Sequence, residues 1–201
     1  MKTINFLNLQ KKEATELYNT GKPFNLIVET ADTHMPDGYL PDYAPKPYDS
    51  QYANAIAHST LLTVEFVRWI QQQPFYDNTT IVMIGDHLSM AVKFFKDFDK
   101  DYQRRQFNLI LNPADNVKNV DESRFRNRVY ANFDMYPTTL AAMGCEIKGD
   151  RLALGTNLFS KQKTLLEKYG VDFASNELTM SSSFYNEKLL MDSNADGTTT
   201  F

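Results

Sequence analysis

The pattern of apolar and polar positions predicts helices and strands that alternate along the first half of the chain. A helix is expected from Asn8 to Thr20, because Gly21 and Pro23 then stop it. Phe24–Thr30, FNLIVET, is a mostly continuous apolar run, typical of a strand covered on both faces. Thr80–Ile84 is a second run of this kind.

The clearest helical periodicity runs from Asp49 to about Gln73. At about 100° per residue most of its circumference is apolar, and one face carries Tyr52, Ala53, Ile56, Val64, Val67 and Ile70. The remaining narrow stripe is polar and consists of Asn54, His58, Glu65, Arg68 and Gln72. This predicts a largely buried helix with one narrow solvent-exposed face. His58 lies on that face, and we interpret it as a solvated surface histidine rather than a ligand.

A strand, a helix and a second strand in this order predict a right-handed parallel βαβ unit. The fold class is therefore predicted as α/β, a three-layer sandwich with a mostly parallel sheet. Parallel pairing would bring the carboxyl ends of the strands at 24–30 and 80–84 to the same edge of the sheet.

The second strand ends in Gly85-Asp86-His87. A carboxylate beside a neutral imidazole suits a borderline divalent ion such as zinc or manganese. A bare Asp-His pair is also typical of a tight turn in which Asp86 caps the next segment. Convergence with the loop that follows the first strand favours the metal site.

That loop, residues 31–50, is rich in proline and carries Asp32 and His34. Arg104 and Arg105 precede a third expected strand, Phe107–Leu111. An arginine in this place could hold a phosphate with two hydrogen bonds, or simply solvate the entrance of the strand.

Other expected elements are shorter. They are a partly helical lid or loop from Ala91 to Gln106, an edge strand at Val129–Tyr130, a helix Met135–Met143 capped by Asp134, a loop at Gly149–Ser160 and a short helix Thr164–Tyr169. Residues 1–174 are predicted to form one domain portion, and residues 175–201 a polar tail that packs loosely.

Composition narrows the classes of function. The net charge is −4 and Lys and Arg do not form a block, which argues against nucleic acid as a partner. One cysteine, Cys145, allows no internal disulfide bond. No apolar run approaches the roughly 18 residues of a membrane span, and the first residues lack the long apolar stretch of a signal peptide.

Four ordered blocks resemble the phosphoglycerol transferases, which include lipoteichoic acid synthase and the periplasmic glucan phosphoglycerol transferase. The blocks are ETADTHMPDGYL, TIVMIGDHLSM, NFDMYPTTLAAMG and GDRLALGTNLFS, within residues 20–160. The resemblance implies an alkaline phosphatase-like α/β fold of the alkaline phosphatase and sulfatase superfamily. It also implies that Asp86 and His87 bind a divalent metal, Mn²⁺ first with Mg²⁺ or Zn²⁺ as alternatives.

The same resemblance places His34 at the phosphoryl or glycerol end of the site as a catalytic and substrate-binding residue. Asp32 and Arg105 are further candidates for substrate binding. The family's nucleophilic threonine and acidic metal ligand belong to blocks upstream of the segment with which this chain begins. We therefore expect the C-terminal part of a longer catalytic domain, inactive by itself, whose partner is the remaining N-terminal half.

The implied reaction moves glycerol phosphate from a phosphatidylglycerol-type lipid to a glycan or teichoic acid acceptor through a threonine intermediate. The implied location is the extracytoplasmic face of a bacterial cell membrane. Two alternatives stay open: a sulfatase or phosphatase that hydrolyses a soluble ester, and a binding module that keeps the fold without the chemistry.

Overall fold

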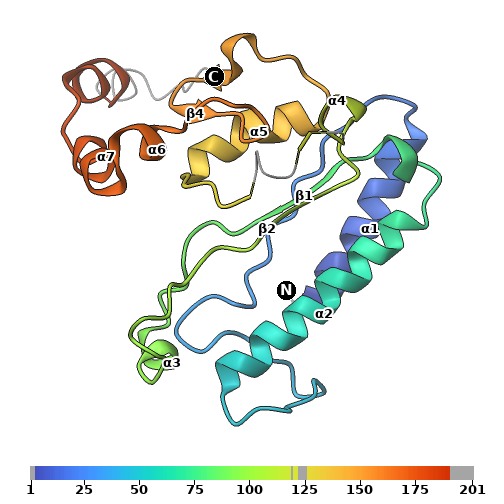
Figure 1. Ribbon diagram of the computed structural model, residues 1–201. Coiled ribbons are helices and arrows are strands. Elements are labelled where there is room, and N and C mark those ends of the chain that lie inside the picture. Colours follow the sequence, from blue (N-terminus) through green and yellow to red (C-terminus); the bar gives the residue numbers. More distant parts are fainter. Residues whose placement is uncertain (1–2, 119, 122–125, 191–201) are drawn as a thin grey trace. The chain divides into compact units, whose positions relative to one another are not determined.

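The computed structural model describes residues 3–118, 120–121 and 126–190 (Figure 1). The chain divides into two compact units, Met1–Pro113 and Ala114–Phe201. The boundary expected between residues 174 and 175 falls inside the helix α7 (Val171–Leu178), and residues 191–201 of the expected tail lie outside the described part. Among the described residues, no helix is both long and apolar enough to cross a membrane.

Two helices make the core of the first unit. Helix α1 (Thr3–Asn19) packs against α2 (Gln51–Gln71), and Ser50 caps α2 by accepting a hydrogen bond from the Ala53 N–H. The buried side chains at their contact are Leu7, Leu62 and Phe66, with Val28, Trp69 and Ile70 packed against them. Both expected helices are confirmed, although α1 begins five residues earlier than Asn8.

The buried face of α2 differs from the predicted one. Its buried side chains include Tyr52, Asn54, Ala55, His58 and Leu62, whereas Val64 is 38% exposed. Since apolar residues surround almost the whole helix, hydrophobicity alone did not fix which side turns inward. Asn54 is buried because its side chain bonds both the N–H and the carbonyl of Tyr48, which draws the preceding loop over this side.

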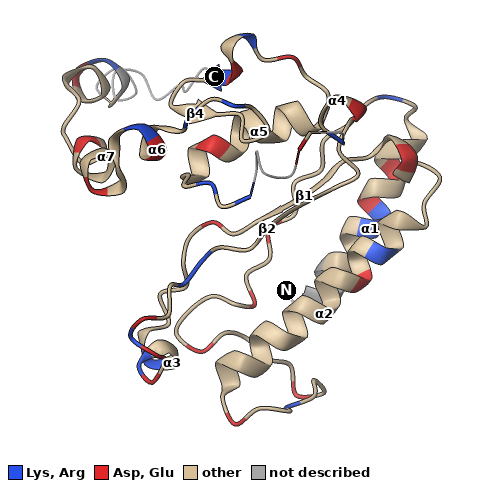
Figure 2. Ribbon diagram, viewed as in Figure 1, with Lys and Arg blue, Asp and Glu red and all other residues tan. Residues whose placement is uncertain are grey.

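Strand β1 (Ile81–Ile84) pairs antiparallel with β2 (Asn108–Leu111), with Ile81 opposite Leu111 and Ile84 opposite Asn108. Residues 85–107 link the two strands as a long arm that contains the short helix α3 (Val92–Phe95) (Figure 1). Charges of both signs mark this arm (Figure 2). The expected strands at 80–84 and 107–111 and the partly helical segment between them are therefore confirmed.

The predicted parallel βαβ unit is wrong for this structure. Phe24–Thr30 is not a strand, and the one described neighbour of β1 is the antiparallel β2. Burial alternates along the segment: Phe24, Leu26 and Val28 are partly buried, while Ile27 is 82% exposed. The continuous apolar run suggested covering layers on both faces, but only one face is covered here. A mostly parallel three-layer sandwich is therefore not seen among the described residues.

The second unit is built from short elements. In chain order they are α4 (Asp115–Lys118), η3 (Asn132–Asp134), α5 (Met135–Ala142), η4 (Lys148–Asp150), β3 (Arg151–Leu152), β4 (Gly155–Thr156), α6 (Leu165–Tyr169), α7 (Val171–Leu178) and the π-helix η5 (Tyr185–Leu190). Strands β3 and β4 form a hairpin inside the segment that was expected to be a loop. A Cβ on Gly155 would stand 2.2 Å from the Phe133 carbonyl oxygen, so only glycine lets β4 approach so closely.

Asp134 is the N-cap residue of α5, as predicted, but its side chain makes no capping hydrogen bond to that helix. Its fully buried carboxylate accepts hydrogen bonds from the Ala131 N–H and the Thr156 N–H, at 2.9 and 2.7 Å, and so ties η3 to β4. The expected edge strand at Val129–Tyr130 is also absent from the assigned strands. The backbone of Val129 is satisfied by side chains instead, because its N–H donates to Glu167 and its carbonyl accepts from the Thr164 hydroxyl.

Candidate active site

Asp86 and His87 lie at the end of β1, where the ladder closes with a hydrogen bond from the Gly85 N–H to the Phe107 carbonyl. Asp86 Oδ1 accepts from the His87 N–H at 2.8 Å, and Asp86 Oδ2 stands 3.2 Å from His87 Nε2. The side chains are 84% and 54% exposed. Both side chains are therefore largely exposed to solvent. The bond between the Asp86 carboxylate and the next N–H in the chain is a local contact, and it does not show Asp86 capping the following segment.

Both ring nitrogens of His87 stand close to an oxygen atom. Nδ1 lies 2.8 Å from the Leu88 carbonyl oxygen, which can only accept, so Nδ1 carries the proton. Nε2 faces Asp86 Oδ2 at 3.2 Å, and in a neutral ring with this tautomer its lone pair would be the one offered to a metal. Two ligands that each bind one ion at about 2.1 Å stand about 3.0–3.4 Å apart in octahedral or tetrahedral geometry. The pair fits two ligands of a single divalent ion.

His34 lies in a compact series of turns after residue 30. The His34 N–H bonds the Ala31 carbonyl, the Gly38 N–H bonds the His34 carbonyl, and the Tyr39 N–H bonds the Asp32 carbonyl at 2.7 Å. The His34 ring is exposed, and its Nδ1 lies 2.8 Å from the Met35 carbonyl. The Met35 carbonyl thus engages Nδ1 of His34 as the Leu88 carbonyl engages Nδ1 of His87. Asp32, a predicted substrate-binding residue, is 8% exposed.

The two loops meet at one phenol oxygen. Tyr52 Oη stands 3.1 Å from the carbonyl oxygen of Thr33, the residue before His34. It also stands 2.6 Å from the hydroxyl of Ser89, two residues after His87. The two loops therefore approach each other at Tyr52 of α2, and not through parallel strands. That His34, Asp86 and His87 line one pocket stays a prediction. Among the described residues, no group of three or more His, Cys, Asp or Glu is arranged to hold a metal.

The two arginines of the arm have different surroundings. Arg104 donates to the Ser89 carbonyl at 2.7 Å and stacks 4.5 Å above the Phe95 ring, so it stabilises the arm. Arg105, the predicted substrate-binding residue, is exposed beside it.

His58 was predicted to be solvated, and that prediction is wrong. The residue is 9% exposed, its ring meets Tyr43 edge-on at 6.0 Å, and Nε2 has no hydrogen-bond partner among the described residues. Only the first part of the predicted polar stripe, Asn54 and His58, is buried. The other members of the stripe are exposed, as predicted: Glu65, Arg68 and Gln72. His58 lies outside the candidate site.

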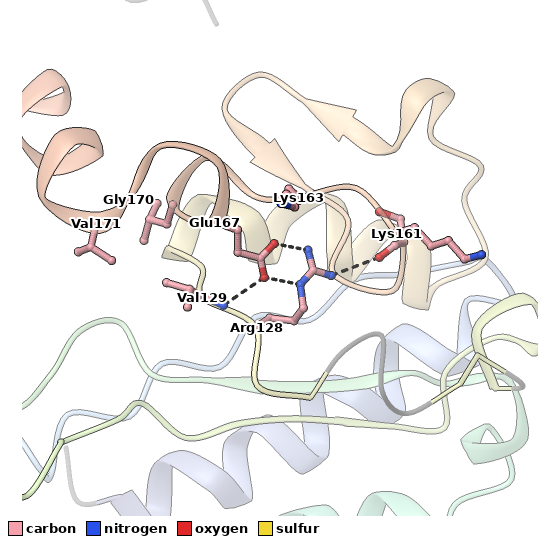
Figure 3. Close-up of a pocket in the computed structure, with 9 residues that line it drawn as sticks. Arg128, Val129, Lys161, Lys163, Glu167, Gly170 and Val171 are labelled. Carbon is pink, nitrogen blue, oxygen red and sulfur yellow. Dashed lines mark hydrogen bonds and ion pairs between the residues drawn. The ribbon is translucent and has the colours of Figure 1, made fainter.

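The second unit contains an open cavity of about 670 Å³ beside a partly buried ion pair (Figure 3). Arg128 meets the Glu167 carboxylate with two nitrogens, at 2.6 and 2.9 Å. Its remaining donors bond the carbonyls of Leu158, Ser160 and Gln162. Five donors thus meet five acceptors, so this arginine braces a loop and is not available to a ligand.

Two carboxylates of the second unit, Glu167 and Asp134, have shifted pKa values. Hydrogen bonds from Arg128 hold the pKa of Glu167 below its ordinary value of 4.5. Burial raises the pKa of Asp134 above its ordinary value of 3.8, against the opposing hydrogen bonds from the Ala131 and Thr156 N–H groups. The sequence offered no spacing signal for the Arg128–Glu167 pair, because its members lie 39 positions apart.

Comparison with protein families shows the family to which the chain belongs. The family profile described as Sulfatase matches residues 5–145, which include both candidate loops. This chain belongs to the Sulfatase family. Membership in the Sulfatase family implies an alkaline phosphatase-like α/β fold, and it confirms the resemblance to the alkaline phosphatase and sulfatase superfamily. No solved structure matches the chain.

Within this superfamily, the curated relatives include phosphoglycerol transferases. Phosphoglycerol transferase I of Citrobacter koseri is 33% identical over 104 residues, which are 48% of this chain and 13% of that protein. The proteins of the same name from Salmonella paratyphi B and Salmonella newport are 32% identical over the same lengths. The match thus spans 13% of the length of these relatives.

Proposed function

We propose that this chain supplies the metal-binding part of a phosphoglycerol transferase. The observation that carries the proposal is the Asp86–His87 pair, with a carboxylate oxygen 3.2 Å from an imidazole nitrogen at the end of β1. The similarity to proteins named phosphoglycerol transferase I gives the reaction class. In this proposal glycerol phosphate passes from a phosphatidylglycerol-type lipid to a glycan or teichoic acid acceptor at the extracytoplasmic face of a bacterial membrane.

In this proposal Asp86 and His87 hold the divalent ion, Mn²⁺ first with Mg²⁺ or Zn²⁺ as alternatives. Asp86 contributes negative charge and His87 a neutral nitrogen lone pair. When bound, such an ion supplies Lewis-acid chemistry to a phosphoryl oxygen. The hydrogen bond from His87 Nδ1 to Leu88 keeps the ligating tautomer in place.

His34 serves the substrate in this proposal. As an imidazolium it keeps Nδ1–H on the Met35 carbonyl and gives the Nε2 proton to a phosphoryl or leaving-group oxygen. Asp32 and Arg105 line the glycerol and phosphate end. The attacking threonine and the acidic ligand come from an N-terminal half of the catalytic domain, which is the proposed partner and completes the alkaline phosphatase-like α/β fold.

Two features support such a partner. Ile27 is 82% exposed, Ile84 is 53% exposed and Leu109 is 37% exposed, although each belongs to or follows an apolar run. Catalytic zinc sites typically use three protein ligands, whereas Asp86 and His87 supply two. The 201-residue chain alone is therefore expected to bind metal weakly and to turn over no donor.

A donor assay on the complete protein tests the proposal. Release of diacylglycerol from phosphatidylglycerol vesicles is measured with Mn²⁺, beside hydrolysis of nitrophenyl sulfate and nitrophenyl phosphate. We expect turnover of the lipid donor, lowered about 100-fold or more by His87→Ala, because even outer partners of metal ligands cost 10–100-fold. The Sulfatase match favours a second function, ester hydrolysis. Turnover of the soluble esters without turnover of the lipid would establish it and exclude the transferase.

A further inference from the structure

Tyr52 stands between the two loops of the candidate site. It belongs to the first turn of α2, is 4% exposed, and places its hydroxyl oxygen 3.1 Å from Thr33 O and 2.6 Å from Ser89 Oγ. A buried phenol normally finds hydrogen-bond partners, and here both partners flank candidate site residues. One oxygen thus joins segments that are 56 positions apart in the sequence, since 89 − 33 = 56.

The direction of each hydrogen bond follows from the acceptors. The Thr33 carbonyl can only accept, so the Tyr52 hydroxyl donates to it. The Ser89 hydroxyl therefore donates to Tyr52, and Ser89 Oγ accepts from the Ala91 N–H at 3.3 Å. Only one assignment of donors and acceptors is consistent with these three hydrogen bonds, and in it both hydroxyl groups donate to an acceptor. Such a fully satisfied network orders the groups that it joins.

The ring is held independently of its hydroxyl. It meets Phe94 of α3 edge-on at 5.1 Å, and its Cδ2 lies 3.5 Å from the place where a Cβ on Gly38 would stand. Arg104 holds the other side of the network through the Ser89 carbonyl. A phenylalanine at position 52 would therefore keep the packing and lose only the two bonds of the hydroxyl.

We propose that Tyr52 is a positioning residue, whose hydroxyl sets the placement of His34 relative to Asp86 and His87. This inference rests on the proposed function of that site. Tyr52 touches neither metal nor substrate; it acts through Thr33 and Ser89. Loss of the hydroxyl frees the two loops to move against each other, so the chemical step slows while binding of the lipid head group changes little.

The test compares four variants of the complete protein with wild type: Tyr52→Phe, Ser89→Ala, the double variant, and Tyr48→Phe as a matched control. Tyr48 is 56% exposed, and its backbone bonds to Asn54 do not involve its hydroxyl. Amide hydrogen exchange is measured for residues 31–39 and 86–91. Values of kcat and KM are measured on phosphatidylglycerol vesicles at saturating Mn²⁺.

We expect Tyr52→Phe to speed amide exchange in both segments. It should also lower kcat about threefold to tenfold, because the free energy of one lost hydrogen bond corresponds to a rate factor of about this size. KM should stay within about twofold. Ser89→Ala should reproduce the effect and add little to it in the double variant, because both changes break one network. Tyr48→Phe should change neither quantity.

The outcomes separate this inference from the proposed function. Unchanged exchange in Tyr52→Phe would overturn the bridge, whatever the enzyme's activity. Faster exchange with unchanged kcat would overturn the positioning role. If amide exchange is faster in Tyr52→Phe than in wild type, but the wild-type protein releases no diacylglycerol, the bridge is supported and the proposed function is overturned.

Discussion

At the scale of single residues, two carboxylates of the second unit respond oppositely to the fold. Glu167 is stabilised as an anion by Arg128, so its pKa is lowered. Asp134 is fully buried, and burial raises its pKa although two N–H groups donate to it. A carboxylate that gains a paired arginine favours the fold when charged, whereas a carboxylate that loses its hydration favours it when protonated.

Glu167→Gln should lower the free energy of unfolding by about 2–4 kcal/mol at pH 7, because it leaves the partly buried Arg128 without its counterion. Since the pKa of Glu167 is lower in the folded state, its contribution is present above pH 4.5 and is lost as the pH falls below that value. Urea unfolding of both proteins between pH 3 and pH 7 measures this. A difference between the two that does not shrink in acid would contradict the assignment.

Residue chemistry was predictable from the sequence where it depends on neighbours in the chain. Asp86 and His87 are adjacent after an apolar run and lie at the end of β1, as the sequence indicated, and their side chains stand 3.2 Å apart; their role as metal ligands stays a prediction. His58 and Tyr52 were not predictable in the same way. Both lie on α2, and their surroundings come from the loop at 31–48 and from Ser89, segments whose contacts no helical periodicity encodes.

At the scale of elements, the loop that carries His34 depends on its close approach to α2. Gly38 has φ +66°, and a Cβ there would stand 2.8 Å from Ala55 Cβ and 2.8 Å from the Asp32 carbonyl oxygen. Neither neighbour is the end of a flexible side chain. Glycine is therefore required for both backbone conformation and space.

Gly38→Ala should lower the free energy of unfolding by about 2–4 kcal/mol, since strain at positive φ and overpacking each cost about 1–3 kcal/mol. Gly21→Ala is the matched control, because Gly21 has φ +67° but nothing within 4 Å of a Cβ. Gly21→Ala should lower the free energy of unfolding by about 1 kcal/mol only, because it adds strain at positive φ without overpacking. Chemical denaturation measures both variants. Equal losses of unfolding free energy would show that the close approach of Gly38 to α2 does not contribute to the cost.

The two long helices and the strand at 81–84 could be predicted because their signals are local: periodicity, a capping serine, and glycine or proline stops. The pairing of β1 could not. Its partner β2 returns after the arm, and Asn112 closes the end of the pair by bonding the Tyr76 and Thr79 carbonyls. Those contacts join distant positions, so the apolar run at 24–30 was assigned a parallel pairing that this structure does not form.

At the scale of the whole molecule, apolar surface on the first unit is the feature that the proposed N-terminal half would explain. Segment 24–30 has the alternating burial of a strand with one covered face, and Ile27 points outward. An aliphatic side chain that is 82% exposed contributes little to the stability of the unit on which it stands.

Ile27→Asp should therefore change the unfolding free energy of the 201-residue chain by no more than about 0.5 kcal/mol. In the complete protein the same change should cost about 2 kcal/mol or more, because a carboxylate would replace an apolar side chain in a covered layer. Denaturation of both proteins, with and without the substitution, gives the comparison. Equal and small effects in the two contexts would argue against a half-domain packed on this face.

The central claim is that Asp86 and His87 hold a divalent ion while His34 serves the substrate. Calorimetric titration of Mn²⁺ into the complete protein and into its His87→Ala and His34→Ala variants tests it most directly. We expect His87→Ala to lose measurable binding, because the Nε2 that faces Asp86 at 3.2 Å is removed, and His34→Ala to bind nearly as wild type does. Loss of Mn²⁺ binding in His34→Ala as complete as in His87→Ala would make His34 a ligand and contradict this division of roles.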